Sequence, residues 1–418
     1  MAHALHLLRH GNVRFYFIGL CVATIAMFMQ LTALGWFVYR LSGSPFLLGV
    51  SGFAFLIPML VVTPVAGLLA DRVDRRRLLR VTQSFSLALG ALLAALSLAG
   101  FATVPLVIGL ALALGVVSAL DASARNVFLL DLVGNRADLP NAIAMQALAV
   151  NVARFVGPAL AGVSLAELGE GWTFALTALG YAPLLVALIR LQQSAAARPR
   201  RLAAWHIELV DGFRYVLRIM PLRRVAVVAA VMSLAIGPYQ SIMPVFARDT
   251  LAGDARTLGW LLSAAGLGAL IATGYLASRR GVPGLGRVIA AAAVTTSVAM
   301  LAFSQTRALW QALPCLVVLG FGYIAINASI NTLMQALSED HLRGRVVGIF
   351  LMLAIGLVPI GNLAVGALVE WIGERPALLA CGLAGLAAGL WFIRGYPTWR
   401  DAVRPLYQRA GLLAPPPS

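Results

Sequence analysis

The sequence has no lysine, and only 11% of its 418 residues are charged. A soluble domain carries about a quarter charged residues, so a soluble fold of this composition would expose large apolar patches to water. The hydrophobic residues, 61% of the chain, fall in long continuous runs rather than in the short alternating segments of an outer-membrane barrel. These absences exclude both classes and predict an all-α integral membrane protein.

Cysteine is also scarce. Cys21, Cys315 and Cys381 lie in separate apolar runs, so they form no metal motif and no disulfide framework. Without lysine there is no Gly-Lys-Ser/Thr loop to hold nucleotide phosphates, which argues against direct drive by ATP. The net charge of +16 is spread over loops between apolar runs, whereas nucleic-acid binding needs a clustered basic face. We expect no enzyme activity, no cofactor, no metal and no nucleic-acid partner.

Twelve apolar runs are long enough to cross a bilayer core of about 30 Å, which needs about twenty residues per helix. They lie near 15–39, 47–70, 78–100, 104–130, 140–166, 172–192, 223–247, 257–278, 285–305, 309–337, 345–370 and 376–394.

Arginine placement predicts the orientation of these spans. With both termini in the cytoplasm, only five of the 32 arginines face outward, and Arg154 alone is assigned to the interior of a span. The five are Arg40, Arg248, Arg256, Arg307 and Arg375. Because cytoplasmic loops carry the excess of positive charge, the pattern predicts a multi-pass protein of the bacterial inner membrane with both termini inside.

A polar segment in the middle divides the spans into six and six. We expect an N-terminal bundle at 1–192, a cytoplasmic linker at 193–222, a C-terminal bundle at 223–394 and a cytoplasmic tail at 395–418. The linker has apolar residues at helical spacing, which predicts an amphipathic helix on the membrane surface or a soluble linker helix packed on the loops.

The two halves share a glycine pattern. Gly157, Gly162 and Gly169 recur 204 positions later as Gly361, Gly366 and Gly373. GLLADR at 67–72 has a counterpart, GYLASR, at 274–279. The repeats predict two pseudo-symmetric six-helix bundles, an architecture in which transporters place the substrate between the halves.

Four segments carry a resemblance to a known family. They are GLLADRVDRRRLLR at 67–80, NVARFVGPALAG at 151–162, DGFRYVLR at 211–218 and LRGRVVG at 342–348. Together they resemble the major facilitator superfamily, and within it the twelve-span drug:proton antiporters of the macrolide-efflux and siderophore-exporter type. The resemblance implies secondary active transport by alternating access.

The resemblance also implies a cytoplasmic latch. The Asp71 carboxylate would pair with basic residues of the gate, to which Arg72 belongs, and would face the start of the eleventh span at Arg345. A carboxylate facing a helix N-terminus gains about 0.3–1 kcal/mol. The other interpretation is that the arginines of this loop are solvated and only set topology; we favour it for the arginines and the latch for Asp71. Asp74 stands where the family usually has glycine. Asp121 and Arg125, one turn apart, can pair and belong to the same expected gate network.

Gly157, Pro158 and Gly162 resemble the antiporter signature of drug exporters, or else they form a tight helix crossing of a common kind. Gly361 and Gly366 repeat them. Arg154 must find a partner, because a charge inside a span costs at least about 2.5–3.5 kcal/mol. It either lines the substrate path or is tied to carbonyls or to an acid of the fourth span.

Several polar residues within the spans are candidates for the substrate path or for coupling. They are Asn151, Gln30, Tyr239, Gln240, Asn327 and Asn331. Asn327, Asn331 and Gln335 recur every four residues, so they share a helix face. Glu167 and Glu370, at the outer ends of the fifth and eleventh spans, are proton sites or, as we favour, ordinary interfacial charges.

The sequence therefore predicts a monomeric exporter of a small amphipathic organic compound, of drug or siderophore type, working by proton antiport in the lipid bilayer. Two alternatives stay open at this point. One is a flippase for lipid or lysolipid, and the other is a non-transporting membrane sensor or assembly partner.

Overall fold

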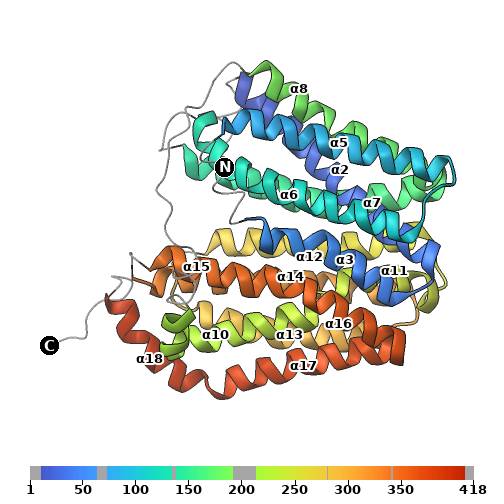
Figure 1. Cartoon of the computed structure of the whole chain (residues 1–418). Coiled ribbons are helices and arrows are strands. Elements are labelled where there is room, and N and C mark those ends of the chain that lie inside the picture. Colours follow the sequence, from blue (N-terminus) through green and yellow to red (C-terminus); the bar gives the residue numbers. More distant parts are fainter. Residues whose placement is uncertain are drawn as a thin grey trace. The chain divides into compact units, whose positions relative to one another are not determined.

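The computed structural model describes residues 11–63, 73–133, 138–191, 213–279, 281–339 and 342–409. Within these ranges the regular structure is helical and no strand occurs, so the all-α prediction is confirmed (Figure 1). The helices of the first half are α2 (Gly11–Ser42), α3 (Pro45–Val61), α5 (Arg75–Leu98), α6 (Val104–Val133), α7 (Leu139–Gly180) and α8 (Ala182–Arg190).

The second half contains α-helices interrupted by three π-helical segments. They are α10 (Met220–Val231), η1 (Met232–Ile236), α11 (Tyr239–Val245), η2 (Phe246–Thr250), α12 (Ala255–Ser278), α13 (Leu285–Gln305), α14 (Leu309–Leu337), α15 (Arg343–Leu351), η3 (Met352–Gly356), α16 (Leu357–Ile372), α17 (Glu374–Arg394) and α18 (Tyr396–Arg409).

Ten helical stretches of the described residues are long and apolar enough to cross a membrane. One of them, Leu139–Arg190, is 52 residues long and contains a backbone kink at Gly169, where φ is 78°. The apolar helix Pro45–Val61 has 17 residues, and the end of the predicted second span, 64–70, lies outside the described residues. The chain is thus a multi-pass membrane protein.

The chain divides into two compact units. Unit 1 contains Met1–Arg200 and Ser241–Gly266, and unit 2 contains Arg201–Gln240 and Leu267–Ser418. In unit 1, α2 packs along α7 and α8, with α5 beside α6 and α7. In unit 2, α13 packs against α14 and α17.

Small residues let the helices of unit 1 approach closely. A Cβ on Gly19 would lie 2.8 Å from Leu184 Cα, and one on Gly157 would lie 2.7 Å from Phe28 Cβ. Such contacts matter because lipid removes most of the hydrophobic drive between spans, which leaves close packing and hydrogen bonds to hold them together.

The repeated glycines occupy similar local environments. Gly361 faces the η1 region as Gly157 faces α2, and a Cβ on it would lie 2.6 Å from Leu234 O. Gly169 and Gly373 both have positive φ values, 78° and 86°, in the region that glycine adopts most readily. Each of these two glycines bends the chain at the end of a span, so the sequence repeat corresponds to a repeated backbone geometry.

The segment 395–418, expected as a tail, contains α18, which packs on α10, α14 and α17. One face of α18 buries Trp399, Val403 and Tyr407, which recur every four residues. Figure 1 shows α18 turning away from the end of α17. Of the linker segment predicted to form an amphipathic helix, the part up to 212 lies outside the described residues, and 213–218 is helical, with Val216 buried and Phe213 and Leu217 exposed.

Candidate functional site

A buried ion pair forms the polar centre of unit 1. Asp121 is 7% exposed and pairs through Oδ2 with the guanidinium of Arg125 on the next turn of α6. Its other oxygen, Oδ1, accepts hydrogen bonds from Thr82 Oγ1 at 3.0 Å and from Gln83 Nε2 at 2.8 Å. Among the carboxylates that the structure describes, Asp121 alone is buried to this degree.

The predicted Asp121–Arg125 pair is therefore present, but its surroundings differ from those expected. Arg125, which the arginine count groups with the cytoplasmic arginines, has a side chain that is 14% exposed and lies in α6, within a helix apolar enough to cross a membrane. The cost of placing this charge inside a span is offset by the carboxylate beside it. Arg125 thus joins Arg154 as a second arginine within a span.

Tyrosine side chains surround the same region. Tyr16 on α2 packs its ring 5.5 Å from that of Phe128 on α6, and its buried hydroxyl has no hydrogen-bond partner in the described chain. Tyr181 donates to Gln30 Oε1 at 2.7 Å, while Gln30 Nε2 is buried without a partner. The helices of unit 1 thus enclose polar groups with spare hydrogen-bonding capacity.

The start of α5 is fixed by three specific contacts. Asp74 caps the helix, accepting from the backbone N–H of Arg76 at 2.9 Å and of Arg77 at 3.3 Å, so the aspartate in place of the family's glycine has a local role. Arg75 pairs with Asp131 of α6 at 2.7 Å. Arg76 donates to the carbonyls of Leu188 and Ile189 at the end of α8.

These contacts correct the expectation that the arginines of this loop are solvated. It is wrong for Arg75 and Arg76, because one holds α6 and the other holds the carboxyl end of α8. Together with the cap at Asp74, they fix the position of α5, from which Thr82 and Gln83 reach Asp121.

Arg154 on α7 has a partner of another kind from those predicted. Its guanidinium carbon lies 5.6 Å from the ring centroid of Phe28 on α2, the geometry of a cation–π interaction. Its Nε is buried without a hydrogen-bond partner among the described residues. One turn before it, Asn151 donates to Ala147 O at 2.9 Å within its own helix.

The glycines of the fifth span make a backbone-to-backbone crossing with α12 inside unit 1. A Cβ on Gly162 would lie 2.7 Å from Ala255 O and 2.9 Å from Gly259 Cα. A Cβ on Gly259 would lie 2.7 Å from the carbonyl oxygen of Pro158, which is itself buried. The segment packs closely against α12 at these positions, and its antiporter role stays a prediction.

A second group of charged residues in unit 1 joins the ends of several helices. Arg40 pairs with Glu170 at 2.5 Å, and Arg256 pairs with Glu167. Tyr39 at the end of α2 donates to Asp249 of η2. Through its ion pair with Arg256, Glu167 joins α7 to the start of α12, and its interfacial role stays a prediction.

Unit 2 contains the amide residues of α14. Gln335 donates to Asn331 Oδ1 at 2.9 Å, so the predicted shared face is confirmed for this pair. Asn327 donates to Tyr323 O in the preceding turn, and its own Oδ1 is buried without a partner in the described chain. Gln240 donates to the hydroxyl of Tyr239 at 3.1 Å.

The helix breaks in unit 2 lie close to these groups. A Cβ on Gly237, at the end of η1, would lie 3.0 Å from the hydroxyl of Tyr323. The π-helical segments η1 and η3 are joined by a hydrogen bond from Ser233 Oγ to Ala354 O at 3.1 Å. Such segments are frequent at functional sites because they redirect side chains within a helix.

The remaining predicted residues are placed as follows. Asp71 and Arg72 lie outside the described residues, so the latch stays a prediction. Arg345 lies in the first turn of α15, half-buried, where the eleventh span was expected to begin. Gly366 is buried in α16. The described residues contain no cluster of three or more histidine, cysteine, aspartate or glutamate side chains that could hold a metal.

Several partners in these networks were missed from sequence. Thr82 and Gln83 stand out only as polar residues within an apolar run, and nothing in the sequence aligns them with Asp121. Tyr39 and Asp249 are 210 residues apart. Only the packing of helices shows that such positions meet.

Solved structures share the fold of this chain. The chain has a TM-score of 0.76 with a crystal structure of the peptide transporter POT in complex with alafosfalin, at 13% identity, over 94% of this chain and 95% of that one. With a crystal structure of the nucleoside transporter NupG the score is 0.71 at 14% identity, over 91% and 99%. The fold is that of the major facilitator superfamily, a class of membrane transporters.

Within that class, residues 2–404 match the family described as transmembrane secretion effectors, and the chain belongs to it. Curated relatives extend over most of its length. The multidrug efflux pump Tap of Mycolicibacterium fortuitum is 29% identical over 379 residues, covering 87% of this chain and 90% of that protein. The staphyloferrin A transporter of Staphylococcus aureus is 25% identical over 342 residues, covering 81% and 85%.

Proposed function

We propose that this protein exports an amphipathic organic compound, drug-like or siderophore-like, by alternating access and in exchange for protons. Support for the substrate class comes from the relatives named for multidrug efflux and for staphyloferrin A transport. The protein works as a monomeric, non-enzymatic transporter of the bacterial inner membrane with both termini in the cytoplasm. It has twelve spans in two six-helix halves, 1–192 and 223–394, joined by the linker 193–222.

The buried Asp121–Arg125 pair is the observation that supports proton coupling. A carboxylate away from water that also has an internal countercharge can take up a proton only if its partner is released or re-paired. Proton uptake at Asp121 would free Arg125, and the unpartnered hydroxyl of Tyr16 within the same unit can accept a hydrogen bond. Protonation is thereby linked to a rearrangement of helix contacts.

The substrate meets a different set of side chains. The residues proposed for its path are Arg154, Asn151, Gln30, Tyr239, Gln240, Asn327 and Asn331. Aromatic rings and amides suit a bulky organic molecule with scattered polar groups, because a few placed polar groups fix its orientation among apolar walls. The buried, unpartnered Oδ1 of Asn327 can accept a hydrogen bond from such a molecule.

Reconstituted protein in liposomes with an internal pH-sensitive dye tests the exchange. With an imposed pH gradient, addition of a transported compound should dissipate the gradient, and a protonophore should abolish the movement of compound against its gradient. If accumulation persists undiminished after the proton gradient is collapsed, antiport is wrong.

Two variants assign the coupling to Asp121. Asp121→Asn alone leaves Arg125 buried and unpaired, at a cost of about 3–5 kcal/mol. The double variant Asp121→Asn with Arg125→Gln removes both charges, so it should fold and bind substrate while releasing no protons during transport. Asp131→Asn is the matched control, because Asp131 lies on the same helix as Asp121 and pairs with Arg75 of α5. This variant should retain coupling. Normal proton exchange in the double variant would refute the role of Asp121.

A further inference from the structure

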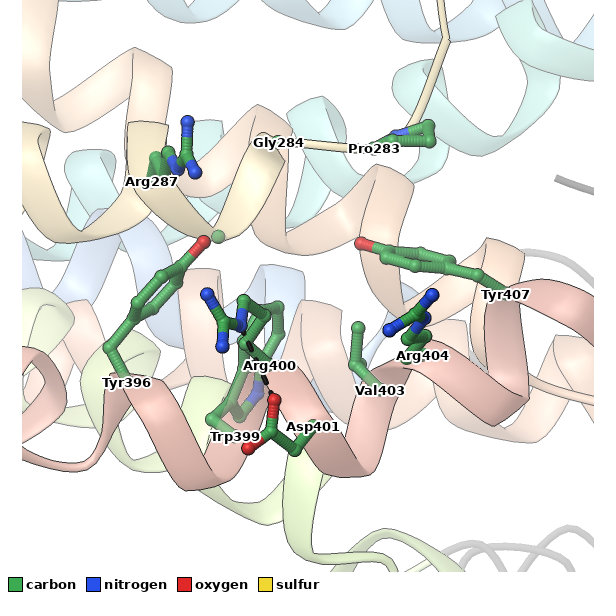
Figure 2. A pocket seen from close by; sticks show the side chains of 11 residues that line it. Pro283, Gly284, Arg287, Tyr396, Trp399, Arg400, Asp401, Val403, Arg404 and Tyr407 are labelled. Carbon is green, nitrogen blue, oxygen red and sulfur yellow. Dashed lines mark hydrogen bonds and ion pairs between the residues drawn. The ribbon is translucent and has the colours of Figure 1, made fainter. Parts of the chain in front are cut away.

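A pocket of about 530 Å³ lies in unit 2, where α18 passes beneath the start of α13 (Figure 2). The inner wall is the buried face of α18, and Trp399 anchors it by donating from Nε1 to Pro221 O at 3.1 Å. The opposite wall is the first turn of α13, at Gly284 and Gly286. Neither the buried networks of unit 1 nor the amide face of α14 contributes to this pocket.

The aromatic wall fits tightly against α13. Tyr396 and Trp399 stack with ring centroids 5.7 Å apart. A Cβ on Gly286 would lie 2.6 Å from Trp399 Cη2 and 3.1 Å from Tyr396 Cε2, so glycine is needed at that position for the rings to pack there. Gly284, with a φ of 90°, turns the chain directly into the helix. The shape of the pocket wall thus depends on the glycines at the start of α13.

The charged groups at the pocket are mainly cationic. Arg287, Arg400 and Arg404 line its exposed rim, and Asp401 offsets one of them through a contact of 3.3 Å with Arg400. The first turn of α13 adds the positive end of a 21-residue helix, whose N-cap glycine supplies no side-chain acceptor. An anion is the ligand that this arrangement attracts.

Tyr407 supplies an independent sign of a missing acceptor. Its side chain is buried, at 5% exposed, and its hydroxyl has no hydrogen-bond partner within the described chain. Figure 2 shows this hydroxyl directed into the pocket. Burial, with a smaller contribution from Tyr396, raises the pKa of Tyr407 to about 12, so the phenol keeps its proton at neutral pH and can donate it to a ligand.

We propose that the pocket binds a phosphate ester, with the phosphate between the arginine rim, the start of α13 and the Tyr407 hydroxyl. Arginine forks and helix N-termini match phosphate oxygens in geometry and charge. The position of the pocket favours a phosphate that belongs to the headgroup of an anionic phospholipid, since basic pockets at the membrane surface bind such headgroups. The pocket lies where the apolar span α13 begins and α17 ends, and α17 exposes Leu390 and Trp391 in its last turns for acyl chains.

Delipidated full-length protein, titrated with phosphatidylglycerol or phosphatidylcholine and followed by native mass spectrometry and thermal unfolding, tests the site. Phosphatidylglycerol should bind the wild type at least tenfold more tightly than phosphatidylcholine. Tyr407→Phe keeps the ring packing and removes one donor to a charged group, so it should weaken phosphatidylglycerol about tenfold. The double variant Arg287→Gln with Arg404→Gln should weaken it further.

Arg307→Gln is the matched control, because Arg307 is exposed beyond the other end of α13 and should leave binding unchanged. An inorganic-phosphate arm separates the sources of the ligand. Phosphate that binds with the same variant dependence, while phosphatidylglycerol does not, supports the phosphate site and refutes the lipid as its occupant. If neither ligand distinguishes the pocket variants from wild type and Arg307→Gln, the proposal is wrong.

Discussion

At the scale of single residues, the two arginines within spans show how a buried charge is accommodated. Arg125 has a carboxylate on its own helix, so the pair is locally neutral. Arg154 faces the ring of Phe28 at 5.6 Å and keeps a buried Nε without a partner in the described chain. A cation–π contact contributes about 0.5–2 kcal/mol, less than the cost of the charge. Arg154 therefore keeps capacity for a further partner.

We expect Arg154→Met, which retains side-chain length but removes the charge, to lower substrate transport at least tenfold while the protein stays folded. Arg154→Lys should recover part of the activity, since it retains the cation without the planar guanidinium. Transport by reconstituted protein and thermal unfolding are the two measurements.

Phe28→Leu serves as the control for this change, because it removes the aromatic partner and leaves the charge in place. A structural role for Arg154 predicts that Phe28→Leu and Arg154→Met lower the unfolding temperature together and affect transport alike. Normal transport by Arg154→Met would show that Arg154 is not part of the substrate path.

At the scale of helices, glycine positions decide where the spans meet. Gly157 on α7 approaches α2, and Gly361 on α16 approaches η1, 204 positions later. In both cases a Cβ would fall within 2.7 Å of an atom on the facing helix. The repeated sequence thus reproduces a repeated crossing, and overpacking at either one should distort the bundle.

Gly157→Ala should destabilise the protein by about 1–3 kcal/mol, because the added methyl group meets Phe28 Cβ and the carbonyl of Ile25. Thermal unfolding in detergent measures the effect. Gly109→Ala in α6 is the matched control: nothing lies within 4 Å of its Cβ position, so the exchange should be neutral or stabilise by up to about 1 kcal/mol. Equal effects at the two positions would contradict a tight crossing at Gly157.

At the scale of the whole molecule, the distribution of arginine predicts which side of the membrane each loop faces. Arg307, between α13 and α14, is predicted to face outward, and Arg214, before α10, is predicted to face the cytoplasm. Both are exposed. The proposed orientation places these two positions on opposite sides of the membrane. Measuring which side each one faces therefore tests that orientation.

After replacement of Cys21, Cys315 and Cys381 by alanine, Arg307→Cys should react with a membrane-impermeant maleimide in right-side-out vesicles. Arg214→Cys should react only after the vesicles are permeabilised. Labelling of both without permeabilisation, or the reverse order, would contradict the proposed orientation. Retained transport by each single-cysteine protein controls for misfolding.

Several features followed from local sequence alone because they depend on composition or on helix periodicity. Low charge and long apolar runs predicted membrane helices, and a four-residue spacing placed Asn331 and Gln335 on one face. The i, i+4 spacing predicted the Asp121–Arg125 pair. The Gly157–Gly162 segment predicted a close crossing, since small residues permit backbone approach wherever the partner helix lies.

The sequence by itself thus determined the class of fold, the positions of most spans and the residues able to pair within one helix. Tertiary structure alone decided that Thr82 and Gln83 meet Asp121, that Arg75 and Arg76 tie α5 to α6 and α8, and that Tyr407 ends in a pocket beneath α13. The physical reason is the range of the forces involved. Solvation and helix periodicity act along the chain, whereas these contacts exist only after helix packing has set which faces are opposed.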